Sequence, residues 1–537
     1  MESRRFNTVN ALLDEAFEKY SSLPAYTCLG TTLTYRDLKR LSYQFASYLQ
    51  HHTSLKPGDR IAIQLPNVLQ YPVALYGATL AGMVIVNTNP LYTERELKHQ
   101  LCDSGAKALV VLSNVADKAA AVVKDTSIES VIISELGDLL PWPKRPIVNF
   151  VVRFVKKMVP AFKFEQSISF LHALTLGDKP LNSVSPEAED LYVLQYTGGT
   201  TGLAKGAMLS HRNLCANVYQ LKNQLSRLFN KESEVIVAAL PLYHIFAFNV
   251  HALSGFSSGS HNVLIPNPRD IPAFVKAVKN FNVTAYVAVN TLYNALLRNE
   301  SFRALDFSSL LTSAAGGMAL TEDVATSWEK LTGCPVCEGY GLTETSPVVT
   351  SNPDLDIRVG TIGKALCDTE LKLIDDDGNT VNDGDPGELC VRGPQVMQGY
   401  WQRPEATAEV LSADGWFKTG DIVVHVGDGY YKIVDRKKDM ILVSGFNVYP
   451  NEIEDYVALH PDVIEAAAVG VPSDETGEAV KLFVVRSNPS LSKDELIKYC
   501  RKGLTGYKVP KLIEFKEDLP KTNVGKILRR ELRENNS

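Results

Sequence analysis

The sequence has few cysteines, no long apolar run and no leader-like N-terminus. The first ten residues include Arg4 and Arg5 but lack the apolar core of a signal peptide. No uninterrupted apolar run is long enough to cross a bilayer. Eight cysteines in 537 residues are too sparse for the disulfide framework of a small secreted domain: Cys28, Cys102, Cys215, Cys334, Cys337, Cys367, Cys390 and Cys500. These absences predict a cytoplasmic protein.

An excess of positive charge is also absent. The chain has 55 Lys and Arg against 61 Asp and Glu, a net charge of -6. Nucleic-acid-binding domains usually carry a concentrated basic face, so this balance argues against nucleic acid and for a small-molecule substrate. The hydrophobic share of 45% is enough for large cores, and the length predicts two or more domains.

A loop rich in glycine and threonine lies between Tyr196 and Gly206. The apolar run 191–194 predicts a strand before it, and Ser210 can cap a helix over 210–225. Glycines let the backbone approach a bulky anion, and N–H groups, hydroxyls and an ammonium can hold phosphate oxygens. The candidate residues are Thr197, Gly198, Gly199, Thr200, Thr201, Gly202 and Lys205. It is not a Walker loop, because Lys205 precedes Gly206 rather than Ser or Thr. A flexible linker is the alternative.

Strands and helices are expected to alternate through most of the chain, which predicts parallel sheets covered on both sides. Helices are expected over 34–50, 69–81, 93–105, 271–281 and 292–298, and strands over 60–65, 83–86, 108–112, 235–240, 283–289 and 310–315. Thr34 with Asp37, and Thr93 with Glu96, have the spacing of a capping box.

The pattern changes after Pro353. Short β-rich runs over 361–374, 387–391, 422–426 and 430–434 suggest hairpins or a small barrel. Beyond Asp435, helices over 452–459 and 493–502 and strands over 466–471, 481–485 and 512–515 predict a compact α+β unit. We therefore divide the chain into domains 1–437 and 438–537.

The segment 141–164 mixes basic and apolar side chains. Its lysines and arginines alternate with residues such as Phe150, Phe154 and Met158. A basic amphipathic stretch can lie on an anionic membrane surface, here the inner face of the cell membrane. The alternative is an ordinary surface helix with a buried apolar stripe.

Several motifs follow predicted strands, where α/β proteins usually place ligands. His244 lies in 241–246, and Gly316 with Gly317 offers a backbone that a planar ring could approach. A lone histidine is more often structural, and such glycines also occur as simple turns. Cys334 and Cys337 have redox spacing, but without a second pair packing is the better interpretation.

The run 338–345 combines an aromatic ring, glycines, a hydroxyl and a carboxylate: Gly339, Tyr340, Gly341, Thr343 and Glu344. Such a set could hold a base, a phosphate and Mg2+, which needs only one or two protein carboxylates when it is bound to a triphosphate. Asp421 and Arg436 could bind ribose hydroxyls or form a surface ion pair. Near the end, Gly525 exposes Lys526 on a tight loop.

Together these motifs, in this order, resemble the acyl-adenylate-forming superfamily of acyl- and aryl-CoA synthetases, luciferases and peptide-synthetase adenylation domains. The similarity covers essentially the whole chain, and 194–211, 240–246, 338–347 and 445–450 look most like bacterial long-chain fatty-acid CoA ligases. It implies an α/β fold with a large N-terminal domain of stacked αβ sheets, a β-rich subdomain and a small mobile α+β C-terminal domain.

The resemblance implies an enzyme that converts a carboxylate and Mg-ATP to acyl-AMP and then transfers the acyl group to CoA. Lys526, Thr343 and His244 would be the catalytic residues. Lys526 would bridge the substrate carboxylate and the α-phosphate, Thr343 would contact that phosphate, and Glu344 would hold Mg2+. Residues 197–205 would hold the other phosphates. Gly316, Gly317 and Tyr340 would bind adenine, and Asp421 and Arg436 ribose. The hinge maps to Lys438, CoA to Gly445 and Phe446, and an acyl tunnel near His244 to Phe248, Tyr286 and Val289.

Other interpretations stay open at this stage. A medium-chain or aryl acid, or a carrier-protein acceptor, would use the same motifs, although no carrier module follows Ser537, which favours free CoA. A lipid-binding pseudo-enzyme would not need Lys526, Glu344 and Thr343 together. The sequence leaves open a homodimer and the preferred acyl chain length.

Overall fold

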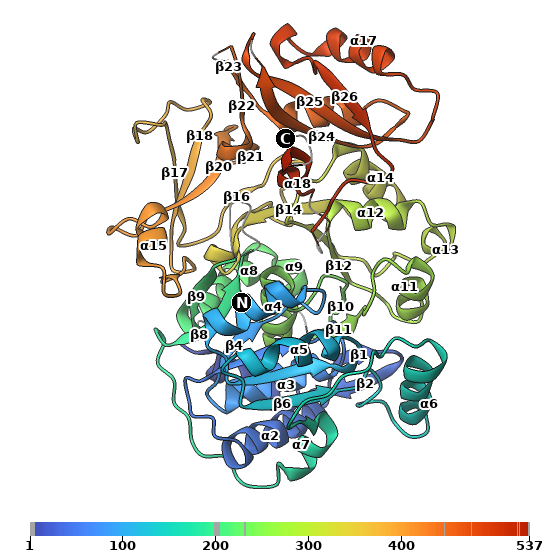
Figure 1. Cartoon of the computed structure of the whole chain (residues 1–537), viewed down its shortest axis with the longest axis vertical. Helices are drawn as coiled ribbons and strands as arrows, with labels where there is room; N and C mark the ends of the chain where they lie inside the picture. Colours follow the sequence, from blue (N-terminus) through green and yellow to red (C-terminus); the bar gives the residue numbers. More distant parts are fainter. Residues whose placement is uncertain are drawn as a thin grey trace. The chain divides into compact units, whose positions relative to one another are not determined.

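The computed structural model describes residues 6–197, 204–229, 232–444, 446–473, 475–522, 525 and 527–534. The chain divides into two compact units (Figure 1). Unit 1 comprises Met1–Val359, Leu366–Thr369 and Gly393–Ser412, and unit 2 comprises Gly360–Ala365, Glu370–Arg392 and Ala413–Ser537. The predicted division into 1–437 and 438–537 stays a prediction.

The first sheet of unit 1 has the strand order β19-β9-β8-β4-β3-β5-β6-β7. Its strands are β3 (Arg60–Gln64), β4 (Val84–Asn87), β5 (Ala108–Leu112), β6 (Ser130–Ser134), β7 (Ile168–Ser169), β8 (Leu191–Tyr196), β9 (Gly206–Ser210) and β19 (Gly399–Tyr400). The strands from β8 to β7 are parallel, while β9 and β19 run antiparallel to their neighbours. The parallel sheet predicted from the alternation is confirmed.

The second sheet of unit 1 runs in the order β15-β14-β13-β12-β10-β11-β1-β2. Its strands are β1 (Pro24–Cys28), β2 (Thr31–Thr34), β10 (Val235–Ala238), β11 (His261–Leu264), β12 (Ala285–Ala288), β13 (Thr312–Ala315), β14 (Val336–Gly341) and β15 (Val348–Ser351). The six strands from β14 to β1 are parallel. Helices α11 (Ile271–Val278), α12 (Asn290–Leu297), α13 (Glu300–Arg303) and α14 (Glu322–Thr332) contribute to a core on one face.

The predicted helix starts have a clear local cause. Helix α2 (Tyr35–His52) begins with the Thr34–Asp37 capping box, and α4 (Glu94–Ser104) with the Thr93–Glu96 box. In each box the threonine hydroxyl accepts from a backbone N–H and the carboxylate accepts in return, so donors that the helix leaves unpaired are satisfied. Gly105 ends α4 in the left-handed conformation with φ 59°.

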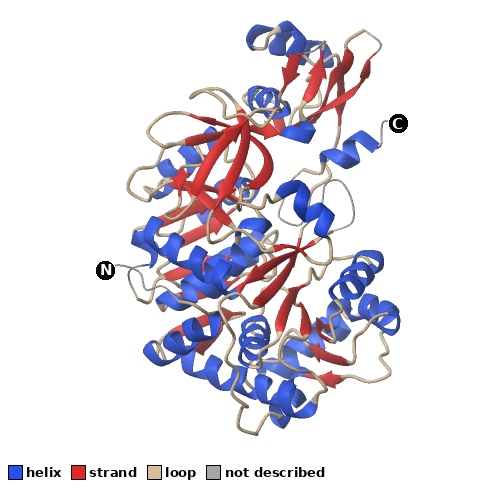
Figure 2. Ribbon diagram, turned by 90° about the vertical axis from the view of Figure 1, so that its left-hand side faces the viewer, coloured by secondary structure: helices blue, strands red, loops and turns tan. Residues whose placement is uncertain are grey.

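Helix α3 (Gln70–Leu80) joins the two sheets of unit 1. Every one of its residues is buried, as expected for a helix that is apolar on all sides. The Tyr71 hydroxyl donates to Asn87 at the end of β4 and to the Leu242 carbonyl beyond β10. Strands and helices thus form alternating layers in this unit (Figure 2).

The segment around the phosphate loop differs from the predicted strand–loop–helix order. Strand β9 lies between the loop and helix α8 (His211–Gln224), and it pairs antiparallel with β8. The loop is therefore the connection of a β-hairpin. Ser210 does cap α8, through a capping box with Asn213, so one end of the prediction was correct and the intervening strand was missed.

Unit 2 contains two sheets. The first is the antiparallel order β17-β18-β20-β21, with β17 (Glu370–Ile374), β18 (Gly387–Arg392), β20 (Phe417–His425) and β21 (Tyr431–Arg436). Its edge strands β17 and β21 do not pair with each other among the described residues, so the hairpins were predicted correctly but the suggested barrel was not.

The second sheet of unit 2 is the predicted α+β part. It contains β22 (Ile441–Val443), β23 (Phe446–Val448), β24 (Val463–Ser473), β25 (Gly477–Arg486) and β26 (Leu512–Phe515), with helices α16 (Pro450–Ala458), α17 (Lys493–Gly503) and α18 (Arg529–Glu534). Across the described part of both units, no helix has the length and apolarity needed to cross a membrane.

Candidate active site

Several predicted site motifs of unit 1, the phosphate loop excepted, lie at one edge of its second sheet. Strands β10, β12, β13 and β14 are parallel neighbours, so their carboxyl ends lie side by side. From these ends continue His244, Val289, the Gly316–Gly317 pair and the turn that carries Thr343 and Glu344. Chain order and strand direction thus bring together residues that are up to a hundred positions apart.

The backbone at Gly316 leaves little room for a side chain. A Cβ there would lie 3.2 Å from the Gly339 carbonyl oxygen and 3.3 Å from the Phe246 ring, and Gly317 has φ +80°. Tyr340 on β14 is only 8% exposed. The crowding and the positive φ explain why glycines stand here, while the predicted adenine contact stays a prediction.

The turn after β14 also requires a glycine. A Cβ on Gly341 would lie 2.0 Å from the Pro347 carbonyl oxygen, which accepts a hydrogen bond from the Leu342 N–H at 3.0 Å. This closed turn leads into the 3-10 helix η6 (Thr343–Thr345). Thr343 and Glu344 remain partly exposed there, so a hydroxyl and a carboxylate are presented from a fixed backbone.

Of the predicted phosphate-loop residues, Thr197 and Lys205 at its two ends are described. Tyr196 pairs with Gly206 across the hairpin, and the Thr197 N–H donates to the Lys205 carbonyl at 2.9 Å. Gly198, Gly199, Thr200, Thr201 and Gly202 lie outside the described residues. The hairpin therefore fixes both ends of the predicted phosphate loop.

Residues of the segment 393–412 complete this region, and sequence reasoning missed them. The Tyr400 hydroxyl donates to Glu344 Oε1 at 2.7 Å, and the Lys205 ammonium lies 5.0 Å from the centre of the Tyr400 ring. No local motif marks Tyr400, and its relation to Glu344 arises only through the pairing of β19 with β9.

His244 is partly buried and follows β10. Burial lowers its pKa to about 4, and its Nδ1 accepts from the Phe246 N–H at 3.4 Å. At neutral pH the imidazole is therefore uncharged. It can orient or pack against a ligand but does not supply a positive charge, and its predicted catalytic role stays a prediction.

The three predicted tunnel residues are all buried. Phe248 opens the π-helix η4 (Phe248–Gly255) with 0% exposure, and Tyr286 and Val289 are 3% and 6% exposed. Tyr286 contacts the aromatic cluster of Phe302 and Trp328, with ring centroids 5.7 and 5.5 Å away. Its ring thus belongs to the core packed against the helices, and the tunnel stays a prediction.

The remaining predicted motif of unit 1 serves packing. Cys334 and Cys337 are free and buried, and burial raises the pKa of the Cys337 thiol to about 12. A thiol that stays protonated is a poor redox nucleophile.

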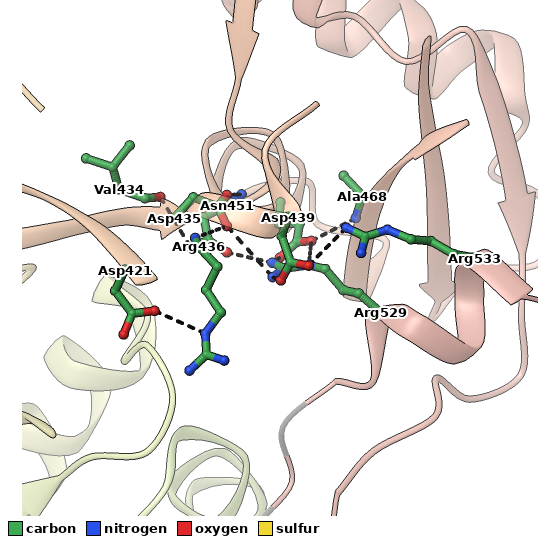
Figure 3. Close-up of polar contacts among 10 residues, drawn as sticks. Asp421, Val434, Asp435, Arg436, Asp439, Asn451, Ala468, Arg529 and Arg533 are labelled. Carbon is green, nitrogen blue, oxygen red and sulfur yellow. Dashed lines mark hydrogen bonds and ion pairs between the residues drawn. The ribbon is translucent and has the colours of Figure 1, made fainter. Parts of the chain in front are cut away.

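In unit 2, Asp421 and Arg436 face each other across β20 and β21. Their ion pair has an N–O distance of 3.1 Å, and the Asp421 side chain is 4% exposed (Figure 3). The pair is therefore partly buried rather than a loose surface contact. Beside it an open pocket of about 320 Å³ is lined by Thr419, Gly420, Arg436, Lys437 and Lys438. Burial lowers the pKa of Lys438, the predicted hinge residue.

An ionic cluster centred on Arg529 lies close to this hinge (Figure 3). The Arg529 guanidinium bonds to Glu454 at 2.7 Å, to Asn451 Oδ1 at 2.6 Å and to Asp439 at 3.3 Å. The Asn451 N–H donates to the fully buried Asp435 at 2.7 Å. The sequence showed these residues only as scattered charges.

The predicted CoA and lysine positions are described only in part. Phe446 is 55% exposed, and its ring stacks on Tyr507 with centroids 4.7 Å apart. Gly445 and Lys526 lie outside the described residues.

The residues around Glu344 fit Mg2+ bound to a triphosphate. Such an ion takes one or two protein carboxylates and completes its shell with phosphate and water. Glu344 supplies one carboxylate, and it shares a neighbour, Tyr400, with the cationic Lys205. The described residues contain no cluster of three or more acidic, histidine or cysteine side chains suited to a protein-only metal site.

Two protein families match the sequence. Residues 13–401 match the family described as AMP-binding enzyme, and residues 452–526 match the AMP-binding enzyme C-terminal domain.

Several relatives that match almost the whole chain carry the name long-chain-fatty-acid–CoA ligase. The long-chain-fatty-acid–CoA ligase of Salmonella typhimurium is 55% identical over 99% of this chain and 95% of its own. The protein of the same name from Haemophilus influenzae is 51% identical, covering 99% of this chain and 96% of its own.

Solved structures share the fold. The anthranilate CoA ligase AuaEII, in complex with anthranoyl-AMP, superposes with a TM-score of 0.87 at 25% identity, covering 99% of this chain and 97% of its own. Sheets, helices and the small C-terminal part thus agree with a known architecture over the full length.

Proposed function

The chain belongs to the family of AMP-binding enzymes, and we propose that it is a long-chain fatty-acid CoA ligase. It activates a long-chain fatty acid with ATP and passes the acyl group to CoA, releasing AMP and pyrophosphate. The observation that carries this proposal is 55% identity over 99% of the chain to a ligase of that name.

The reaction proceeds in two steps. A carboxylate oxygen attacks the α-phosphorus of ATP, and the bond to the bridging oxygen breaks, so pyrophosphate leaves and acyl-AMP forms. The CoA sulfur then attacks the acyl carbonyl carbon, the thiol proton is lost, and AMP leaves. Both steps concentrate negative charge on oxygen, so fixed cations and N–H donors supply most of the rate.

The residues of unit 1 act on the nucleotide. The ends of the hairpin loop at Thr197 and Lys205 hold the β- and γ-phosphates, and Thr343 donates to the α-phosphate. Gly316 and Gly317 admit the adenine ring, against which Tyr340 lies. The proximity of the Gly316–Gly317 pair to the turn with Thr343 at one edge of the second sheet supports this assignment.

Glu344 would hold Mg2+ together with the substrate phosphates, and the bound ion would neutralise phosphate charge. In unit 2, Asp421 and Arg436 bind ribose, Lys526 contacts the carboxylate and α-phosphate, Phe446 and Gly445 contribute to CoA binding, and Lys438 is the hinge. The pocket beside Arg436 supports the ribose assignment.

A decisive experiment measures AMP release from Mg-ATP with and without CoA, across saturated acids from acetate to palmitate and with benzoate. We expect CoA-dependent release that is greatest for long chains. A maximum at short or aromatic acids would keep the mechanism and reject the substrate, and AMP release without CoA dependence would indicate another acceptor.

We extend the proposal to location: the enzyme works in the cytoplasm and docks on the inner face of the membrane. The support is the helix α6 (Lys144–Phe150) and its π-helical continuation η3 (Val151–Val155), which form the edge of unit 1 (Figure 1). A homodimer stays a prediction.

The helix directs polar side chains toward the protein and large apolar side chains toward solvent. Its inward side is tethered by polar contacts, since Asn149 accepts from the Gly137 N–H at 2.7 Å and Arg153 pairs with Glu135 at 2.5 Å. Most large apolar side chains on and beside the helix face solvent, whereas Val152 is buried. The exposed fractions of these side chains lie between 53% and 80%: Trp142, Ile147, Phe150, Phe154, Val155 and Met158.

The outward apolar side chains and their neighbouring cations suit an anionic bilayer. Lys156 and Lys157 are exposed next to Phe154 and Val155, and such basic residues are attracted by anionic lipid while apolar residues enter the interface. Phe162, also in the predicted segment, instead packs against the core of the first sheet. The alternative of a buried apolar stripe therefore holds for that distal part and for Val152, which is buried in η3.

A further inference from the structure

Tyr400 lies at a point where three separate chain segments meet. Strand β19 pairs antiparallel with β9, so that Tyr400 lies opposite Ala207. The Trp401 N–H donates to the Gly206 carbonyl at 2.8 Å. This pairing fixes Tyr400 against the strand that leads out of the phosphate loop. Its position is set by backbone hydrogen bonds and does not depend on the contacts of its side chain.

The same segment is bound to the turn that carries Glu344. The Met397 N–H donates to the Glu344 backbone carbonyl at 2.8 Å, and the Tyr400 hydroxyl donates to the Glu344 carboxylate at 2.7 Å. A hydrogen bond from a hydroxyl to a carboxylate is charge-assisted and stronger than one between neutral groups. It restricts the rotamer of the Glu344 side chain, which has three torsions and is partly exposed.

The Tyr400 ring has a second role. The Lys205 ammonium lies 5.0 Å from the ring centre, within the range of a cation–π contact. Tyr400 is 8% exposed, so little bulk water reaches its ring. One side chain thus orients both the carboxylate and the cation of the nucleotide site.

We propose that Tyr400 is a positioning residue of the Mg-ATP site, holding the Glu344 carboxylate through its hydroxyl and the Lys205 ammonium through its ring. This rests on the proposed function for the roles of Glu344 and Lys205. Tyr400 thereby holds Glu344, the proposed metal ligand, and Lys205, the proposed phosphate ligand, at a fixed separation before ATP binds.

The test measures the contribution of the Tyr400 hydroxyl separately from that of its ring. Mn2+ serves as the probe, and its binding to the full-length protein with ATP, without fatty acid or CoA, is followed by electron paramagnetic resonance. We expect Tyr400→Phe to raise the half-saturating Mn2+ concentration about tenfold, the range of one charge-assisted bond. Tyr400→Leu, which also removes the ring, should in addition weaken ATP binding measured by calorimetry.

Two controls distinguish positioning from simple stabilisation. Tyr35 is fully buried, and its hydroxyl donates to the Phe256 and Ser260 carbonyls; Tyr35→Phe should lower thermal stability without changing Mn2+ binding. In a double-mutant cycle, Tyr400→Phe should add nothing to the loss in Glu344→Gln, because the hydroxyl acts through that carboxylate.

Unchanged Mn2+ binding in Tyr400→Phe, or fully additive losses with Glu344→Gln, would overturn the inference. Because neither measurement includes an acyl substrate, failure of the fatty-acid assignment leaves this result interpretable. Conversely, a long-chain ligase whose Tyr400→Phe variant binds Mn2+ normally would keep the function and lose the positioning role.

Discussion

At the residue scale, the strongest constraint is the absence of a side chain at Gly341. Because a Cβ there would lie 2.0 Å from the Pro347 carbonyl oxygen, alanine forces the turn apart. We expect Gly341→Ala to destabilise unit 1 by about 1–3 kcal/mol and to reduce AMP formation, since the turn sets Thr343 and Glu344. Gly506→Ala is the matched control because its Cβ meets nothing within 4 Å; equal loss of thermal stability in both variants would contradict the explanation.

A second residue-scale prediction separates the two half-reactions. Lys526→Ala should abolish adenylation, because the charge at the α-phosphate is lost, yet largely spare thioester formation from supplied acyl-AMP. The assay follows pyrophosphate release in the first case and CoA thioester in the second. Equal losses in both half-reactions would remove Lys526 from its proposed role.

Individual residues were predictable where a short motif follows a strand. Gly316, Thr343 and Glu344 come directly after β13 and β14, so strand direction alone placed them together. Tyr400 was not predictable, because it is 56 positions from Glu344 and reaches it only through the β19–β9 pairing. Arg529 was missed for the same reason, since its partners lie on α16 and beside the hinge.

At the element scale, helices with capping boxes were located to within two residues, and strands such as β5 and β26 were located as well, but β9 was missed. Strand β9 has five residues and directly precedes a capped helix, so its sequence was interpreted as part of the loop. Its identity depends on pairing with β8, a non-local contact that local propensity does not report. The orientation of the helix α6 was likewise unpredictable, because periodicity gives an apolar face but not the direction in which it points.

That orientation leads to the element-scale prediction. Phe150→Ser with Phe154→Ser should weaken sedimentation with phosphatidylglycerol-containing vesicles, because apolar area no longer enters the interface. Lys156→Gln with Lys157→Gln should weaken it in a salt-dependent way. The matched control is Lys276→Gln with Lys279→Gln, which removes the same charge from exposed positions on α11 and at its C-cap. Unchanged sedimentation of both test variants would discard the membrane contact.

At the scale of the whole molecule, stability is coupled to pH through buried carboxyl groups. Burial raises the pKa of Asp435 from 3.8 to about 6, an effect that the charge of Arg529 partly offsets. The folded form therefore binds this proton more tightly than the unfolded chain. Its contribution to stability is complete below pH 4 and is lost as pH rises through 6.

The comparison is urea unfolding of the wild-type and Asp435→Asn proteins between pH 4 and 7. The free energy of unfolding of the wild-type protein, relative to that of Asp435→Asn, should fall by up to about 3 kcal/mol as pH rises, because asparagine does not titrate. Asp377→Asn, in an exposed turn, controls for the change of charge. Parallel pH profiles for wild type and Asp435→Asn would show that this carboxyl does not contribute.

The pairing of β19 with β9 has a consequence for the order of synthesis. Without β19, strand β9 is the open edge of the first sheet, and its partner lies about 190 residues further along the chain. At translation rates of roughly 5–20 residues per second, that edge waits on the order of ten seconds or more before its partner leaves the ribosome. An unpaired edge is a template for other strands, so the β8–β9 hairpin that carries the proposed phosphate loop is exposed to wrong pairing, and to chaperone binding, while the rest of the chain is synthesised.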